Sequence, residues 1–329
     1  MRTIAFFNNK GGVGKTTLVY HLACMIADRG QTVLAADLDP QANLTSMFLD
    51  EDRLECLWPN GEHEHTIYGA LRPIIRGLGD VQTPHVEKIH SHLALVVGDL
   101  ALSTFEDKLS AAWLSCHNRD ESAFRTMTAF YRGVRQAAMD LQAAWILMDV
   151  GPNLGAINRA ALLASEHVVI PLSPDLFSWQ GLRNLGPSLQ SWRETWSDLM
   201  SKSPDPALEL PEGRIEPLGY VVMQPLMREN RPIKAYRRWI DRFPAAYREF
   251  VLERPEVAPP IAESDPYCLA MLKHYRSLMP MAMESRKPVF SLTPADGAIG
   301  AHGDAARRAH QDFLTLARRI AERSGATMN

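Results

Sequence analysis

The chain has 329 residues, of which 46% are hydrophobic and 22% are charged, and its formal net charge is −3. These values are typical of a globular protein with a sizeable buried core, and they exclude a disordered chain. The overall charge provides no general attraction for nucleic acid, so any such binding has to come from a local basic patch.

Strands and helices alternate from the first residues onward. Residues 3–8 form an apolar run rich in β-formers, residues 16–29 carry apolar side chains at helical spacing, and residues 32–36 form a second buried strand. A strand, a turn, a helix and a strand make a βαβ unit, and such units build parallel sheets.

The same alternation continues to the end of the chain. Further strands are expected at residues 93–97, 145–148, 167–171 and 218–223, and further helices at 124–142, 158–164, 179–197, 232–242 and 305–323. This order predicts an α/β fold with a doubly wound, mostly parallel sheet and helices on both faces. No linker or low-complexity run divides the sequence, so residues 1–329 are expected to form a single domain.

The cysteines and the apolar runs narrow the class of protein further. The four cysteines lack the close paired spacing of a metal site, a redox pair or an iron–sulfur cluster, which predicts reduced structural thiols. The first residues lack the order of a signal peptide, and no run reaches the ~18 apolar residues of a membrane span. We therefore expect a cytoplasmic protein.

A glycine-rich turn separates the first strand from the first helix. Gly11, Gly12 and Gly14 allow a tight backbone turn that aims N–H groups at an anion, and the helix N-terminus adds its positive dipole end. Lys15 is placed to reach the β- and γ-phosphates, and the Thr16 hydroxyl is placed to bind Mg²⁺. The turn predicts a site for ATP and Mg²⁺ whose residues are Gly11, Gly12, Val13, Gly14, Lys15, Thr16 and Thr17.

Acidic residues close two of the expected strands. Asp37 and Asp39 end the second strand, where Pro40 prevents a regular continuation, and Asp149 ends the apolar run 145–148. Ligands of open α/β sheets bind at the carboxyl ends of the strands, and Mg²⁺ prefers oxygen ligands. We predict Thr16, Asp39 and Asp149 as metal ligands, directly or through water. Asp37 or Asp39 is also suited to orient the attacking water.

The run from Lys10 to Thr17, followed by Asp37 to Asn43, resembles the deviant Walker A motif and switch I of the ParA/MinD family of ATPases. The strict P-loop pattern is incomplete, because Asn9 stands where its first glycine belongs, and Lys10 adds a second lysine. In that family the second lysine reaches across a nucleotide-sandwich dimer. The resemblance therefore implies an ATP-bound homodimer in which Lys10 contacts the nucleotide phosphates of the partner copy.

The resemblance also implies roles in hydrolysis. Asp39 matches the switch I aspartate tied to hydrolysis, so Lys10, Lys15 and Asp39 are the expected catalytic residues. The stretch from Asp149 to Pro152 resembles the Walker B and switch II segment. Relatives often carry a proline where this chain has Gly151, so the coupling of this switch to nucleotide is expected to differ.

Two further features follow from the comparison with the family. In relatives the strand matching residues 218–223 delivers groups that contact the base, which implies Met223, Gln224 and Pro225. Residues 51–92 and 104–142 make the chain longer than a minimal member of the family. Helical or loop elaborations are therefore expected there, with a specialised partner surface as their function.

The family implies a slow ATPase that dimerises on ATP, binds a matrix, and is released when a partner protein stimulates hydrolysis. Such proteins serve DNA partition or the positioning of intracellular cargo. The sequence after Ile320 lacks an apolar face flanked by lysines, so a MinD-like membrane anchor is not expected. Non-specific DNA is the expected matrix, which implies nucleoid association. The candidate contacts are Arg231, Lys234, Arg237, Arg238 and Arg242.

Other functions remain open at this point. The basic helix face is alternatively a solvated surface, which leaves a ParA-like switch that binds only proteins. A P-loop ligase or kinase would need polar groups converging on the γ-phosphate, and Asp37 or the elaborations can supply them. An electron carrier of the nitrogenase-reductase type would need cysteines for a bridging cluster. Cys116 is the only cysteine in the central region, which disfavours this class.

Overall fold

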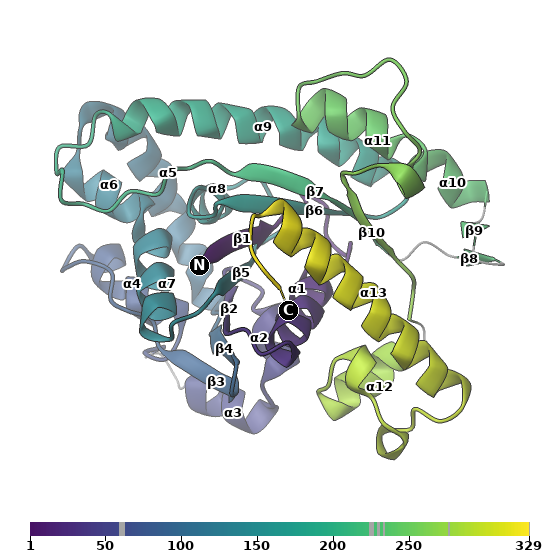
Figure 1. Cartoon of the computed structure of the whole chain (residues 1–329). Coiled ribbons are helices and arrows are strands. Elements are labelled where there is room, and N and C mark those ends of the chain that lie inside the picture. Colours follow the sequence, from purple (N-terminus) through teal and green to yellow (C-terminus); the bar gives the residue numbers. More distant parts are fainter. Residues whose placement is uncertain (59–62, 224–226, 229–230, 233, 276, 329) are drawn as a thin grey trace.

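An eight-stranded sheet forms the centre of the fold (Figure 1). The computed structural model describes residues 1–58, 63–223, 227–228, 231–232, 234–275 and 277–328. The strands of the sheet are β1 (Arg2–Phe6), β2 (Val33–Asp37), β3 (Val86–His90), β4 (Leu93–Val96), β5 (Trp145–Asp149), β6 (His167–Leu172), β7 (Glu216–Met223) and β10 (Cys268–Leu272). Strands β8 (Met227–Arg228) and β9 (Arg231–Pro232) pair separately.

The strand order is β10-β7-β6-β1-β5-β2-β4-β3, and every neighbouring pair is parallel except β3 with β4. The crossovers place helices on both faces of the sheet (Figure 1). The predicted α/β fold with a doubly wound, mostly parallel sheet is therefore confirmed.

Helices flank the sheet along most of the chain. They are α1 (Lys15–Asp28), α2 (Asn43–Phe48), α3 (Glu51–Leu57), α4 (Ile67–Arg76), α5 (Glu106–Ser115), α6 (Glu121–Met127), α7 (Ala129–Asp140), α8 (Ala156–Leu163), α9 (Leu176–Met200), α10 (Lys234–Ile240), α11 (Phe243–Ala246), α12 (Leu278–Ser285) and α13 (Ala301–Arg323). Short helical turns of other types include η1 (Leu100–Phe105), η3 (Tyr247–Val251) and η5 (Val289–Ser291). Within the described ranges, no helix combines the length and the apolar character that crossing a membrane requires.

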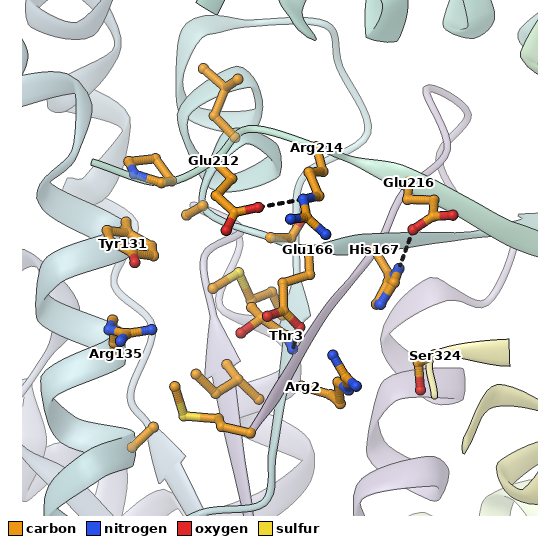
Figure 2. Close-up of a pocket in the computed structure, with 18 of the residues that line it drawn as sticks. Arg2, Thr3, Tyr131, Arg135, Glu166, His167, Glu212, Arg214, Glu216 and Ser324 are labelled. Atoms are coloured by element: carbon orange, nitrogen blue, oxygen red, sulfur yellow. Dashed lines mark hydrogen bonds and ion pairs between the residues drawn. The ribbon is translucent and has the colours of Figure 1, made fainter. Parts of the chain in front are cut away.

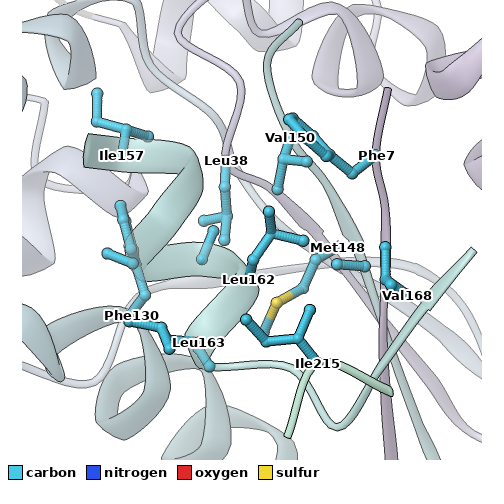
Figure 3. Close-up of a cluster of buried hydrophobic side chains, with 14 of the residues drawn as sticks. Phe7, Leu38, Phe130, Met148, Val150, Ile157, Leu162, Leu163, Val168 and Ile215 are labelled. Carbon is cyan, nitrogen blue, oxygen red and sulfur yellow. The ribbon is translucent and has the colours of Figure 1, made fainter. Parts of the chain in front are cut away.

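The sheet buries both of its faces, so the molecule has two hydrophobic cores. Ala5 of β1 and Phe7 directly after it point into one core, and Ile4 and Phe6 of β1 point into the other, as the two-residue period of a strand requires. Figure 3 shows the first core, where side chains of α7 and α8 pack on strands β1, β5 and β6. Helices α1 and α13 fill the second core.

Several elements differ from the sequence pattern, among them one broken helix and two strands. The helix predicted at residues 124–142 is broken at Thr128, whose hydroxyl donates to the Phe124 carbonyl at 2.8 Å and whose φ and ψ are −97° and 3°. Strands β3 and β10 are not predicted by the sequence. They are the edges of the sheet, and their short runs become strands only by pairing with β4 and β7.

The elaborations at residues 51–92 and 104–142 contact each other through ion pairs. Asp80 accepts hydrogen bonds from Arg125 Nη1 at 2.7 Å and from Arg132 Nη2 at 2.6 Å. Asp80 follows α4, whereas Arg125 and Arg132 belong to α6 and α7. These ion pairs join the two segments to each other, and the first segment also contributes β3 to the sheet.

His21 connects α1 to the C-terminal part of the chain. Its side chain is buried, its Nδ1 lies 2.7 Å from the Thr17 carbonyl, and its Nε2 accepts the Val289 N–H at 3.1 Å. The ring also stacks on Phe313 of α13, with 4.9 Å between centroids. These contacts require the neutral Nδ1–H form, and burial lowers the pKa of His21 from 6.5 to about 4.

This pKa shift predicts a pH dependence of stability. Because the folded pKa lies below the ordinary value, the stabilisation by neutral His21 is complete above pH 6.5 and is lost as the pH falls toward 4. We expect the difference in unfolding free energy between wild type and His21→Gln to shrink by about 2 kcal/mol between pH 8 and pH 5. Urea titrations at both pH values measure it. Other titrating groups are present in both chains and cancel, so a constant difference would contradict this assignment.

Candidate nucleotide-binding site

The glycine-rich turn lies at the carboxyl end of β1, directly before α1. Gly12 and Gly14 have φ values of 72° and 89°, in the left-handed region that favours glycine. Gly14 is the N-cap of α1 and offers no side-chain acceptor, so the first N–H groups of the helix are directed at the space in front of the loop. Such an arrangement binds an anion.

Lys15 lies inside this loop and faces acidic residues. Its side chain is buried, and burial lowers the pKa of Lys15, while the charges of Asp149 and Asp39 act in the opposite direction. A buried ammonium group is poorly hydrated, so it gains by contacting phosphate oxygens. Lys15, Asp39 and Asp149 are thus brought together as the sequence predicts.

Asp149 is the buried carboxylate at the centre of the site. Strand pairing places it beside Phe6 of β1 and Asp37 of β2, at the edge where the phosphate loop begins. Among the described residues, neither of its oxygens has a well-formed hydrogen bond. Burial and the neighbouring Asp37 raise the pKa of Asp149 to about 8, while the nearby Thr16 hydroxyl and Lys15 act in the opposite direction. A buried carboxylate with so little hydrogen bonding fits a site for a divalent cation, which would stabilise its charged form.

Asp37 and Asp39 have different surroundings, although they are two residues apart. Asp37 Oδ2 accepts hydrogen bonds from the Thr45 N–H at 2.8 Å and from the Thr45 hydroxyl at 2.7 Å. A Cβ at Gly98 would lie 2.7 Å from the Asp37 carboxyl carbon. Asp37 is therefore occupied in holding α2 and the turn after β4. Asp39 Oδ1 accepts the Gln41 N–H at 3.0 Å, and the charge of Asp39 acts on Lys15.

The Lys10 side chain lies at the rim of the site and contacts residues of its own chain. Its ammonium group forms an ion pair with Asp175 and lies 6.0 Å from the centroid of the Phe177 ring. Its backbone N–H donates to Asn8 Oδ1 at 2.9 Å. Asp175 also caps α9, because it accepts the Ser178 N–H at 2.9 Å. Asp175 is not among the residues predicted from the sequence, although an aspartate directly before an apolar helix is an N-cap signal.

Met223 lies at the end of β7, close to the start of α1. With Thr17, Leu18, Leu272 and Tyr275 it lines a gap of about 20 Å³. The gap borders the first turn of α1, and a contact of Met223 with the base stays a prediction. Gln224 and Pro225 lie outside the described residues.

Of the side chains predicted to contact DNA, the structure describes those of Arg237, Arg238 and Arg242. Arg237 Nη1 donates to Glu263 at 2.5 Å, and Arg237 also pairs with Asp241, so its charge is largely neutralised. The guanidinium groups of Arg238 and Arg242 stack on Trp239, at 4.5 Å and 5.4 Å from the ring centroid. The side chains of Arg231 and Lys234 are outside the described part of the chain.

A cavity of about 870 Å³ lies at the opposite end of the sheet, where β1 and β6 begin (Figure 2). Some of its charged groups are paired within the cavity: Arg214 forms an ion pair with Glu212, and His167 Nδ1 lies 3.6 Å from Glu216 Oε2. Open α/β sheets bind ligands at the carboxyl ends of their strands. We therefore assign the nucleotide to the phosphate loop and not to this cavity.

Comparison with known proteins identifies the family. The family model described as AAA domain matches residues 1–201, and the chain belongs to this family, with the ParA-like ATPases among its relatives. The chromosome-partitioning ATPase Soj of Thermus thermophilus is 30% identical over 194 residues, which cover 59% of this chain and 63% of Soj. Three curated relatives are matched over between 41% and 63% of their own lengths.

Solved structures share the fold over nearly the whole chain. A protein from Corynebacterium diphtheriae has a TM-score of 0.72 at 22% identity, with 98% of both chains covered. McdA of Cyanothece, in a complex with ATP, has a TM-score of 0.65 at 16% identity, with 100% of this chain and 98% of McdA covered. This chain thus belongs to the family of the ParA-like P-loop ATPases and has their fold.

Proposed function

We propose that this chain is a nucleotide switch: it dimerises on binding ATP and Mg²⁺, binds a matrix in that state, and is released by partner-stimulated hydrolysis. Its role would be DNA partition or the positioning of intracellular cargo. The observation that carries the proposal is the presence of two lysines in one loop with different surroundings. Lys15 lies among the acidic residues of its own site, whereas Lys10 lies at the rim. A self-contained P-loop enzyme needs only the first of these lysines.

The surface around Lys10 supports a second copy of the chain as its partner. Phe177 is 69% exposed and Leu176 is 44% exposed, at the start of α9 beside Lys10. Large apolar side chains exposed next to a charged site are typical of an interface. In the dimer, Lys10 would exchange Asp175 for the phosphates of the partner copy.

Catalysis in this proposal depends on residues at the carboxyl ends of β1, β2 and β5. Thr16 and Asp149 would hold Mg²⁺, with Asp39 in support, and the ion would neutralise charge on the β- and γ-phosphates. Asp39 would orient the attacking water. Lys15, together with Lys10 of the partner copy, would stabilise the charge that develops on the phosphate oxygens. Base contacts would come from Met223 and the residues that follow it.

Non-specific DNA is the matrix that we propose, because basic side chains lie on and near α10 and two copies would present them together. We expect DNA retention to require ATP and Lys10, and to weaken with salt along the log–log line of counterion release. Arg238→Glu with Arg242→Glu should lower DNA affinity at least about tenfold for every sequence, because each site loses phosphate contacts. Arg237→Glu should have less effect, since Arg237 is already paired with Glu263 and Asp241.

A DNA-binding titration with ATP and with ADP at several salt concentrations tests this matrix. Lys10→Ala and the charge-reversed chains are compared with the wild type. If the wild type with ATP shows no retention at low salt, DNA is not the matrix. A switch that binds only protein surfaces would then replace it, while the ATP-dependent dimer would stand.

A further inference from the structure

The switch II turn is held from outside by a residue of the 104–142 elaboration. Helix α8 begins directly after this turn, and its first two N–H groups, from Ala156 and Ile157, donate to the Glu106 carboxylate at 2.5 Å and 2.9 Å. Glu106 is the first residue of α5. A Cβ at Gly155 would lie 2.6 Å from Glu106 Oε1, so this approach requires the glycine. Glu106 thus fixes the N-terminus of α8 by two charge-assisted hydrogen bonds.

Asn158 continues the connection into the turn itself. Its buried amide accepts the Gly151 N–H at 3.0 Å and donates to the Gly151 carbonyl at 3.0 Å and to the Asn153 carbonyl at 2.7 Å. A Cβ at Gly151 would lie 3.4 Å from Asp39 Oδ1, so the turn packs directly against the proposed catalytic carboxylate. A displacement of α8 is therefore transmitted to Gly151 and to the space around Asp39.

Helices α5 and α8 meet at a second point. The guanidinium group of Arg159 lies 4.4 Å from the centroid of the Trp113 ring, on the same pair of helices. The contact between Glu106 and α8 is therefore part of a packed interface. Movement of α5 would move α8 with it.

We propose that Glu106 is a positioning residue for ATP hydrolysis: through α8 and Asn158 it holds the switch II turn against Asp39. This role rests on the proposed function, since it presumes that the site hydrolyses ATP. Glu106 touches neither the phosphate loop nor the acidic residues of the site in the described structure, so it acts on the rate through the turn. The elaboration that carries Glu106 is thereby coupled to the catalytic site.

The test compares Glu106→Ala, Glu106→Gln and the control Asp107→Ala, whose carboxylate is the exposed neighbour on α5. We expect Glu106→Ala to lower kcat about tenfold while the Kd for ATP changes less than about twofold, because a displaced turn affects the transition state more than binding. Glu106→Gln should recover only part of the rate, since its single amide oxygen can replace one of the two carboxylate acceptors while its NH2 group faces the other N–H. Hydrogen exchange of residues 151–157 without nucleotide should be fastest in Glu106→Ala, intermediate in Glu106→Gln and unchanged in Asp107→Ala.

The outcomes separate this role from the proposed function. If the wild type hydrolyses ATP and Glu106→Ala does so at the same rate, the role of Glu106 is wrong and the proposed function stands. Unchanged hydrogen exchange in a folded Glu106→Ala chain also overturns the role. If the wild type itself does not hydrolyse ATP under any condition, the proposed function fails and the role of Glu106 fails with it. Melting temperatures of all four chains verify that they are folded.

Discussion

Lys15→Ala is expected to weaken ATP binding at least about 100-fold, because a charged hydrogen bond to phosphate is worth about 1.5–3 kcal/mol and its loss leaves the bound charge unpaired. Lys15 is the buried lysine of the loop. The charges that act on it come from Asp149 and Asp39, which are negative and cannot bind phosphate in its place. Calorimetric titration with ATP and Mg²⁺ measures the effect.

A matched control separates this effect from a general loss of charge. Lys88→Ala removes an exposed lysine of β3 and should leave ATP binding unchanged. Both chains should keep the wild-type circular dichroism spectrum. If Lys15→Ala binds ATP with the affinity of the wild type, the assignment of the phosphate loop has to be abandoned.

Asp39→Ala is expected to bind ATP within about threefold of the wild-type affinity and to hydrolyse it at least about 100-fold more slowly, the size of effect typical for loss of a group that assists proton transfer or water positioning. The glycine loop and Lys15 supply most of the affinity in our account, whereas Asp39 acts on the hydrolytic step. Steady-state phosphate release and ATP titration measure the two quantities separately.

Two comparisons sharpen this prediction. Asp52→Ala removes an exposed carboxylate of α3 and should match the wild type in both quantities. Asp37→Ala removes the acceptor of both Thr45 hydrogen bonds, so it should lower the melting temperature, an effect that Asp39→Ala should lack. An unchanged rate of phosphate release in Asp39→Ala would remove Asp39 from the mechanism.

The phosphate loop and the acidic residues were predictable from the sequence because their signals are local. Gly11 to Thr16 lie between an apolar strand and an apolar helix, and the position of each aspartate at a strand end determines the edge of the sheet on which it lies. The parallel sheet follows from the same alternation. These features depend on residues that are close in the sequence.

Contacts between distant segments were not predictable. Lys10 and Asp175 are 165 residues apart, and Glu106 meets Ala156 across 50 residues. Position at the strand end leaves Asp37 and Asp39 both open as the residue that orients water, and the family resemblance favours Asp39. The hydrogen bonds from Thr45 to Asp37 add a structural difference between them that the sequence does not show. The edge strands β3 and β10 likewise depend on pairing partners that no local pattern specifies.

The central claim is that ATP converts this chain from a monomer to a dimer, and the mass in solution tests it most directly. Multi-angle light scattering of Asp39→Ala, in which hydrolysis cannot reverse the state, should give twice the chain mass of 36.8 kDa with ATP and Mg²⁺. With ADP, and in the Lys10→Ala Asp39→Ala double variant with ATP, it should give the mass of a single chain. A single-chain mass for Asp39→Ala at saturating ATP, with binding verified by calorimetry, would contradict the account.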